Sequence, residues 1–452
     1  MSRPCAIWQK WSEMMPTSSR VPEPVLLSRA DHGISRKQID DNTLKVLYRL
    51  ARSGYKAYLV GGGVRDLLLG RTPKDFDVGT DATPNQVKKL FRNCFLVGRR
   101  FRLAHVRFGK DSLVEVATFR RQATEDDLPE NPEDHFHFAE NIFGTPWEDA
   151  FRRDFTINAL FYDIETFGII DYVGGLEDLQ ARRLRVIGDP LVRFTEDPVR
   201  MLRALEFAAR LGFSLDQAAR HAIYERAPLI AHAAPARIRE ELQELFRHRV
   251  AGEVLRSAQS LGLLEHLLAG YQGDAPTFDL LDRIDARTAA GIGPDEPLVL
   301  AALFLSRFLR ACPAGGDPGV TEVVRIANLV LAPHCGYFHV ANGIRHQARE
   351  LLVGVFRLSR GPGRRGERRF LQHPLTPLAL ELLRLWSQGS RDSAELLQRW
   401  QQVFDRAQSA GSAAAASAEV AGSEGARRRG DRRRRGRGRG RGRKSPHEAA
   451  PD

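Results

Sequence analysis

The chain has 452 residues, 42% of them hydrophobic, which is enough to bury the cores of two or three packed units. It contains no run of about 18 apolar residues, no apolar signal segment near its start and only four scattered cysteines. This composition excludes a membrane span, a disulfide scaffold and a Cys-based zinc cage, and it predicts a protein of the reducing cytoplasm. The net charge is +12, of which residues 427–444 carry +11, so a nearly neutral body precedes a polycationic tail.

The first third of the chain alternates short apolar runs with glycine turns, as is typical of a mixed α/β unit. Residues 1–35 are rich in Pro and Ser and are expected to form a loose extension. Helices are predicted over residues 35–52, 64–69 and 85–91. Strands are predicted over residues 56–60, 75–78, 94–97, 103–108 and 112–119.

Helix-forming sequence dominates the rest of the chain. Residues 123–140 are acidic, contain Pro and predict a mobile loop, and a strand pair is expected around residues 160–173 and 183–187. From residue 195 to residue 407 the apolar spacing is almost wholly helical. The Arg/Gly tail that follows cannot bury a core, so it is expected to be disordered and to bind nucleic acid, although a plain solubility tail would have the same composition.

These patterns predict an α+β protein with five segments. They are a loose extension (1–35), an α/β head (36–190), a helical neck (191–260), a helical body (261–407) and a disordered basic tail (408–452).

The strongest chemical signal is the run Leu59-Val-Gly-Gly-Gly-Val-Arg-Asp-Leu-Leu-Leu-Gly70. A strand, a glycine turn and a helix in this order suit a phosphate site, because backbone amides without side chains can approach an anion. Gly62 and Gly63 would provide such amides, and Arg65 would reach the same phosphates. No Gly-Lys-Ser/Thr follows and the spacing does not fit a dinucleotide fingerprint, so the two commonest glycine-rich nucleotide sites are excluded.

Two carboxylates follow closely, in Asp75-Phe-Asp77. Alternate residues of a strand point to the same face, so Asp75 and Asp77 would repel each other unless a cation lay between them. Their oxygen ligands suit Mg²⁺, with water and substrate phosphates completing the coordination. By itself an Asp-x-Asp pattern is more often a turn or an exposed strand edge, but beside a phosphate cradle it predicts metal-dependent nucleotidyl transfer.

Further motifs make the sequence resemble the class II nucleotidyltransferases, the bacterial poly(A) polymerases and CCA-adding enzymes of the DNA polymerase β-like superfamily. The resemblance covers roughly residues 38–265. Beyond the glycine turn it depends on three segments: Phe151-Arg-Arg-Asp-Phe-Thr-Ile-Asn-Ala-Leu160, Asp171-Tyr-Val-Gly-Gly-Leu-Glu-Asp-Leu179 and Glu196-Asp-Pro-Val-Arg200 with the helix after it. The resemblance implies a DNA polymerase β-like nucleotidyltransferase head, a nucleotide-reading neck and an RNA-binding body.

The resemblance also implies roles for particular residues. Asp154 would be the third active-site carboxylate, with Glu115 as a competitor, and Arg153 would contact the triphosphate. Asp197 and Arg200 would read the adenine edge, although spacing alone more often means a surface ion pair. Glu206 stands where relatives often have Arg, which departs from the family pattern.

Within the family, Leu96-Val-Gly-Arg-Arg-Phe-Arg-Leu-Ala-His-Val106 is similar to the segment that sets poly(A) polymerases apart from CCA-adding enzymes. The predicted function is therefore template-independent addition of AMP from ATP to RNA 3′ ends, with Mg²⁺ as cofactor and polyadenylation promoting RNA decay. RNA-decay factors and RNA chaperones are plausible partners. The alternatives are a CCA-adding tRNA nucleotidyltransferase and a non-catalytic RNA-binding protein that uses the tail as a tether.

Overall fold

The computed structural model describes residues 23–98, 102–109, 112–121, 142–312, 318–388 and 394–406. The chain divides into two compact units, residues 1–294 with 332–340, and residues 295–331 with 341–452. The predicted loop at 123–140 and the tail lie outside the described residues. None of the helices described is long and apolar enough to cross a membrane.

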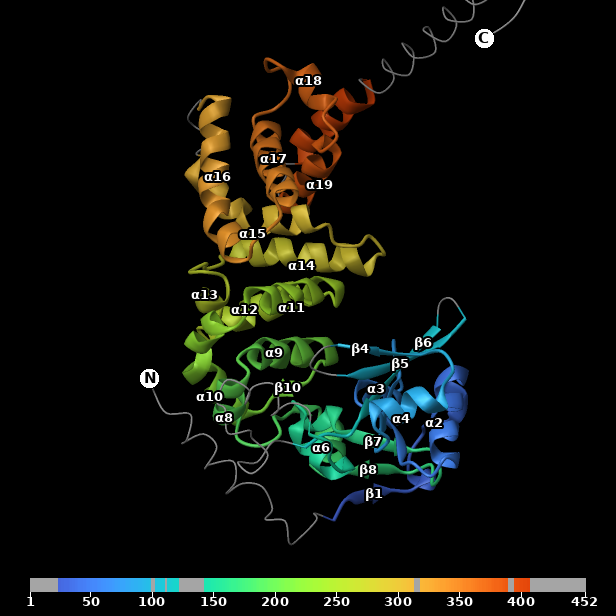
Figure 1. The fold of residues 1–452 in the computed structure, drawn as a ribbon. Helices are drawn as coiled ribbons and strands as arrows, with labels where there is room; N and C mark the ends of the chain where they lie inside the picture. Colours follow the sequence, from blue (N-terminus) through green and yellow to red (C-terminus); the bar gives the residue numbers. More distant parts are fainter. Residues whose placement is uncertain are drawn as a thin grey trace, which may run out of the picture. The chain divides into compact units, whose positions relative to one another are not determined.

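The first unit begins with an eight-stranded mixed sheet in the order β1-β8-β7-β2-β3-β6-β5-β4 (Figure 1). Its strands are β1 (Val25–Leu27), β2 (Ala57–Val60), β3 (Asp77–Thr80), β4 (Cys94–Val97), β5 (Leu103–Phe108), β6 (Ser112–Thr118), β7 (Leu160–Asp163) and β8 (Ile169–Asp171). Among the described strands of this sheet, only β3 and β6 pair in parallel, and the other neighbours are antiparallel. The α+β fold class is thereby confirmed.

Helices of this region cover both faces of the sheet. They are 3₁₀ helices η1 (Arg29–Asp31), η2 (Arg36–Gln38) and η4 (Thr156–Asn158), and α-helices α2 (Asp41–Arg52), α3 (Gly62–Leu68), α4 (Pro84–Leu90), α6 (Pro146–Arg152) and α7 (Gly175–Gln180). The side chain of Asp40 accepts hydrogen bonds from the first backbone amides of α2, which explains why this helix begins there and not at residue 35. Opposite the α2 face, Val60, Phe119, Ala150 and Phe161 belong to a buried apolar cluster.

The remaining helices of the first unit follow in chain order. They are α8 (Pro190–Glu196), α9 (Val199–Leu211), α10 (Gln217–Arg226), 3₁₀ helix η5 (Ala227–His232), α11 (Pro235–Arg247), α12 (Ala251–Ser260), α13 (Leu264–Leu267) and α14 (Ala275–Ala289). A short parallel pair, β9 (Arg183–Leu184) with β10 (Ser214–Leu215), ties the end of the head to this helical region. Helix α9 packs on α8, α11 and α12, so it connects the sheet region with the helices beyond it.

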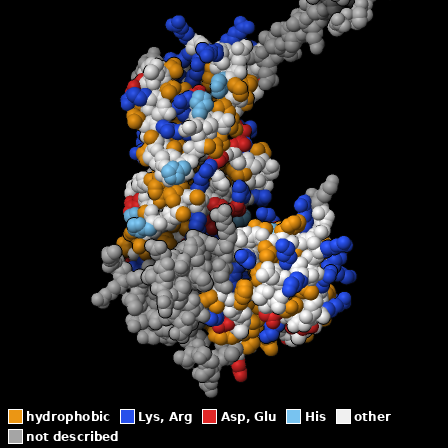
Figure 2. Space-filling model, in the orientation of Figure 1, with side chains coloured by type: hydrophobic (Ala, Val, Ile, Leu, Met, Phe, Trp, Pro, Cys, Tyr) orange, Lys and Arg blue, Asp and Glu red, His pale blue; other side chains and the backbone are white. Residues whose placement is uncertain are grey.

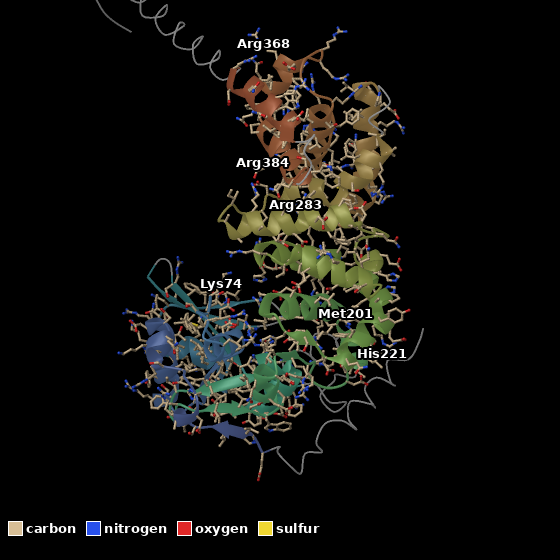
Figure 3. All side chains as sticks on the ribbon, turned by 180° about the vertical axis from the view of Figure 1, so that it is seen from behind. Lys74, Met201, His221, Arg283, Arg368 and Arg384 are labelled. Atoms are coloured by element: carbon tan, nitrogen blue, oxygen red, sulfur yellow. The ribbon has the colours of Figure 1, made fainter. Side chains whose placement is uncertain are left out.

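The second unit is helical. Its elements are α15 (Glu296–Ala311), the first part of α16 (Val320–Tyr337), α17 (Asn342–Ser359), α18 (Glu367–Leu371) and α19 (Thr376–Trp386), followed by a helical segment at 394–406. Helix α17 packs between α15 and α19. The Trp400 side chain is buried and donates to the carbonyl of Leu358. Arg368 on α18 and Arg384 on α19 are exposed at the surface of this unit (Figure 3).

Several predicted elements differ from the observed ones. Residues 25–27, expected in a loose extension, form β1 and pair with β8. The strand expected at 75–78 begins two residues later, at Asp77, so Asp75 precedes it. The segment expected as a strand at 183–187 is short, and it pairs with β10 outside the main sheet. The compact units divide at residue 294, and the boundaries of the neck and the body at residues 191 and 261 stay predictions.

Candidate active site

The glycine turn and Asp77 meet because of strand register. Strands β2 and β3 are antiparallel with Val60 opposite Asp77, so the turn after Val60 starts beside the Asp77 side chain. Gly61 has a φ of 69°, and a Cβ there would lie 3.2 Å from Nη1 of Arg153 and 4.0 Å from Oδ2 of Asp77. Both the backbone conformation and the close approach therefore require glycine at this position.

Two other carboxylates, those of Glu115 and Asp75, affect the pKa of Asp77. Burial raises its pKa to about 6, Glu115 and Asp75 add repulsion, and Arg153 acts in the opposite sense. Glu115 lies opposite Asp77 in the parallel register of β3 and β6, and its carboxylate is 3.4 Å from Nε2 of His105. Asp75 is exposed. A cation beside Asp77 would relieve this repulsion, although no set of three or more His, Cys, Asp or Glu side chains in the described residues forms a metal cage by itself.

A cavity of about 520 Å³ opens next to Asp77. Its lining comes from the glycine turn, the turn after α6, helix α9 and helix α11: Gly61, Gly62, Arg65, Asp77, Arg153, Asp154, Asn158, Asp197, Arg200, Arg203, Phe207, Arg210, Arg237 and Glu241. The structure thus brings together seven of the predicted site residues: Gly62, Arg65, Asp77, Arg153, Asp154, Asp197 and Arg200. Gly63 and Asp75 do not line it; a Cβ on Gly63 would lie 3.5 Å from the Asp75 carbonyl oxygen.

Asp154 is half-buried and already paired. Its Oδ2 lies 2.9 Å from Nη2 of Arg203, and its Oδ1 accepts hydrogen bonds from Asn158 and from the Phe155 amide. Burial alone would raise the pKa of Asp154, but the Arg203 charge and these hydrogen bonds outweigh it and lower the pKa. Asn158 also accepts a 2.6 Å hydrogen bond from Arg65, so the Asp154 carboxylate helps to fix Arg65 in the cavity wall.

Arg193 of α8 binds the backbone of the turn that carries Asp154. This buried guanidinium donates to the carbonyl oxygens of Arg152 and Arg153, at 2.6 and 2.7 Å, and pairs with Glu196 at 2.9 Å. Burial lowers the pKa of Arg193 to about 10. Arg193 therefore couples the Arg152-Arg153-Asp154 turn to the end of α8.

Asp197 lies between α8 and α9, not within a helix as its spacing with Arg200 suggested. It ends α8 in an extended conformation, and its carboxylate lies 4.0 Å from Arg200 but only 2.9 Å from Nη2 of Arg237 on α11. Arg200 also approaches Glu196 at 3.5 Å. The pair proposed to read a base is thus embedded in a wider charged network.

Besides Gly61 of the glycine turn, six cavity residues were absent from the predicted site: Asn158, Arg203, Phe207, Arg210, Arg237 and Glu241. Three of them were detectable, since Arg203, Phe207 and Arg210 continue from Arg200 at intervals of three and four residues along one face of α9. The guanidinium groups of Arg65, Arg203 and Arg210 lie 4.7–5.4 Å from the centre of the Phe207 ring. Arg237 and Glu241 lie on another helix, and no local pattern links them to α9.

Glu206, the residue that departs from the family pattern, is not among the residues that line this cavity. It is buried and lies 2.9 Å from Nε of Arg210 and 2.8 Å from Nδ1 of His248. Its charge therefore orients Arg210, whose guanidinium reaches the cavity.

Comparisons with known proteins place these features in context. Residues 57–185 match the family model "Poly A polymerase head domain", residues 212–272 match "Probable RNA and SrmB- binding site of polymerase A", and residues 317–437 match "Polymerase A arginine-rich C-terminus". The chain is 40% identical over 399 residues to poly(A) polymerase I of Escherichia coli O157:H7, covering 84% of this chain and 85% of that protein.

Sequence similarity to the CCA-adding enzymes covers a smaller part of the chain. The chain is 38% identical over 224 residues to the CCA-adding enzyme of Bacillus licheniformis, covering 50% of this chain and 54% of that enzyme. Among solved structures, the Bacillus stearothermophilus CCA-adding enzyme in complex with CTP is similar with a TM-score of 0.58 and 26% identity, covering 83% of each chain.

Proposed function

The chain belongs to the poly(A) polymerase family of nucleotidyltransferases, and we propose that it adds AMP from ATP to RNA 3′ ends in the cavity beside Asp77. In this reaction the RNA 3′ oxygen bonds to the α-phosphorus of ATP, and the bond to the leaving pyrophosphate breaks. The observation that supports the site most strongly is the convergence of the glycine turn, Asp77 and the α9 arginines on one cavity.

Asp75 and Asp77 would hold Mg²⁺. Their oxygen atoms are the ligand type that Mg²⁺ takes. Burial first, and then repulsion from Glu115 and Asp75, raise the pKa of Asp77, and a divalent cation would offset that repulsion. When bound, the metal would activate the attacking hydroxyl and stabilise charge on the leaving pyrophosphate. Glu115 suits the third carboxylate position, because it is paired in register with Asp77.

Asp154 would then act through its neighbours. Its carboxylate pairs with Arg203 and accepts from Asn158, which in turn binds Arg65. We assign it to positioning the cavity wall, in place of the role as third active-site carboxylate that the resemblance implied. The amides of Gly62 and Gly63, with Arg65 and Arg153, would hold the triphosphate.

Asp197 and Arg200 would select the base. An adenine edge offers an amino donor and ring nitrogen acceptors, which a carboxylate and a guanidinium can satisfy together. Nη2 of Arg237 lies 2.9 Å from Oδ2 of Asp197. When a base binds, Arg237 would either move away from Asp197 or hold its carboxylate in the orientation that contacts the base. ATP is favoured over CTP because the similarity to poly(A) polymerase I covers most of the chain, whereas that to CCA-adding enzymes covers half.

The same relatives support proposals for the partners and the cellular location of the protein. RNA-decay factors and RNA chaperones are the partners we propose, and the match of residues 212–272 to a model described as a probable RNA and SrmB-binding site supports this assignment. We place the enzyme in the cytoplasm. The exposed arginines around α18, including Arg368 and Arg369, would contact RNA from the second unit.

The test is a primer-extension assay with Mg²⁺, a labelled RNA and a tRNA that lacks its last three nucleotides. Each nucleoside triphosphate is supplied singly, and CTP is then combined with ATP. A long ladder with ATP alone on both RNAs is expected. Addition of two C residues and one A, confined to the tRNA, would instead establish CCA addition, and RNA binding without extension would leave only a non-catalytic binder.

A further inference from the structure

A second group of cations lies on the first unit, away from the cavity. Helix α2 and the region of α4 contribute six of them: Lys45, Arg49, Arg52, Lys88, Lys89 and Arg92. All six are exposed, and the segments 44–52 and 84–93 contain no acidic residue. Because the chain outside its tail is nearly neutral, this group, here called the outer basic face, is a strong local excess of positive charge. Figure 2 shows Lys and Arg side chains gathered at the edge of the head where α2 lies.

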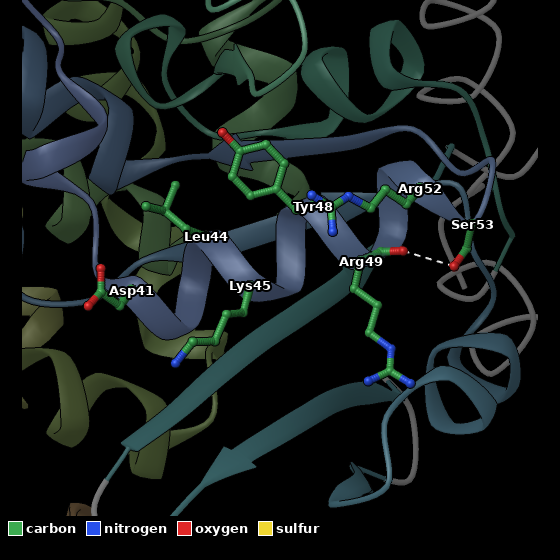
Figure 4. A pocket seen from close by; sticks show the side chains of 7 residues that line it. All are labelled: Asp41, Leu44, Lys45, Tyr48, Arg49, Arg52 and Ser53. Carbon is green, nitrogen blue, oxygen red and sulfur yellow. Dashed lines mark hydrogen bonds between the residues drawn. The ribbon is translucent and has the colours of Figure 1, made fainter.

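The α2 cations rest on aromatic rings and not on carboxylates. Lys45 lies 5.8 Å from the centre of the Phe108 ring and Arg49 lies 5.3 Å from that of Phe91. Arg52 extends toward Tyr48, at 5.8 Å, as Figure 4 shows. No carboxylate among the described residues forms an ion pair with Lys45, Arg49 or Arg52.

Folding alone does not explain this stripe. Lys45, Arg49 and Arg52 are spaced four and three residues apart, so they follow one side of α2, and like charges at such spacing destabilise a helix. They border a hollow of about 500 Å³ that is lined by α2 residues, including a single acidic one, Asp41 (Figure 4). Aromatic contacts orient these cations without neutralising them, which leaves their charge available to an anion.

The outer basic face lies on the side of the sheet opposite the cavity. Successive residues of β7 point to opposite faces. Phe161 lies under the cavity residue Arg153, whereas Tyr162 is on the side of Arg36, which donates to Tyr48 of α2. A polymer whose end lies in the cavity would therefore reach α2 only after passing around the sheet.

We propose that the outer basic face binds the phosphate backbone of RNA upstream of the 3′ end that lies in the cavity. This inference rests on the proposed function, since it takes the RNA substrate from there. Unpaired Lys and Arg side chains on a helix, with no acidic residue between them, complement a phosphate chain and do not require a particular base sequence. Only RNA long enough to pass around the sheet can occupy the cavity and this face together.

The experiment compares full-length wild type with the variant Lys45→Gln/Arg49→Gln/Arg52→Gln on a primer of about 60 nucleotides and on one of 6. The KM for the long RNA is expected to rise several-fold, and the slope of log affinity against log salt is expected to fall by about 2. The kcat, the KM for ATP and the KM for the short primer are expected to remain unchanged. Equal changes with both primers, or none with either, would overturn the proposal.

Two controls separate charge from folding. Lys45→Arg/Arg49→Lys/Arg52→Lys keeps all three charges and is expected to behave as wild type. Arg182→Gln removes an exposed charge elsewhere on the head and is expected to leave the long-RNA KM unchanged; an equal rise with this variant would contradict a specific face. Gel-shift binding of the long RNA gives a readout without catalysis, so failure of the polymerase assignment and failure of this surface are distinguishable.

Discussion

The cavity and the outer basic face are both rich in cations, but they hold them differently. In the cavity, Arg203, Arg210 and Arg237 each lie 2.9 Å from a carboxylate oxygen, so their positions are fixed and their charge is largely balanced. On the outer face, Arg49 and Arg52 lie over aromatic rings and keep their charge unbalanced. Fixed arginines suit the orientation of a reacting triphosphate, whereas unbalanced ones suit salt-dependent retention of a long polyanion.

The largest expected effect comes from Asp77, the cavity carboxylate that forms no ion pair with the described residues. Asp77→Asn should lower kcat by about a thousandfold or more, because losing a metal ligand removes several kcal/mol of transition-state stabilisation. RNA binding and the melting temperature should stay close to wild type, as gel shift and thermal unfolding can check. Near-normal extension by this variant would contradict the proposed metal site.

The second-largest expected effect is on the free energy of unfolding. It tests whether Arg203, an ion-paired arginine of the cavity, is required for the stability of the fold. Arg203→Gln leaves the half-buried Asp154 without its cation and should lower the free energy of unfolding by about 2 kcal/mol. The loss is placed below that of a fully buried pair because the Arg203 side chain is 35% exposed. Urea unfolding measures it, and Arg203→Lys should recover part of the loss; no loss with Gln would show that the pair is not structurally required.

A buried carboxylate on α14, Asp285, forms no ion pair within the part of the chain that the structure describes, and it extends the comparison. Burial raises the pKa of Asp285 to about 7, although its Oδ2 accepts a hydrogen bond from the Gly252 amide. The folded state therefore binds a proton that the unfolded state releases near pH 4, and stability falls as pH rises from about 4 to about 7. Asp285→Asn should stabilise the protein by about 1 kcal/mol at pH 8 and have little effect at pH 4. Urea unfolding at both values checks this, and equal effects at both would contradict the assignment.

The smallest effect is expected on the outer face. Arg49→Gln should change the free energy of unfolding by less than about 0.5 kcal/mol, since the side chain is exposed and makes no ion pair with the described residues. Relief of repulsion with Lys45, four residues earlier, would favour the variant slightly. A loss as large as that of Arg203→Gln would erase the distinction between the two groups.

Local patterns in the sequence predicted much of the head correctly. The strands at 94–97 and 103–108 were predicted with their observed bounds, because alternation and flanking polar residues mark them clearly. The start of β3 was misplaced, because the pairing of Val60 with Asp77 decides it and that pairing is tertiary. The sequence predicts a loose segment for residues 25–27, because a run of three residues is stable as a strand only when it pairs with another strand, here β8.

The site shows the same limit. Gly62, Arg65, Asp77, Arg153, Asp197 and Arg200 were predicted from motifs, and they line one cavity. The partners of these residues were not predicted: Arg237, which contacts Asp197, is 40 residues away in the chain, and Arg203, which pairs with Asp154, is 49 residues away. Such pairings depend on how the helices pack in the folded protein, and local patterns in the sequence do not contain that information.

The most direct test of the distinction between fixed and unbalanced cations is steady-state extension of one long RNA by Arg203→Gln and Arg49→Gln across a range of salt concentrations. We expect Arg203→Gln to lower kcat and to leave the salt dependence of the RNA KM unchanged. We expect Arg49→Gln to keep kcat and to make the RNA KM higher and less dependent on salt. The same change in both variants, whether in kcat or in KM, would contradict the distinction between the two groups of cations.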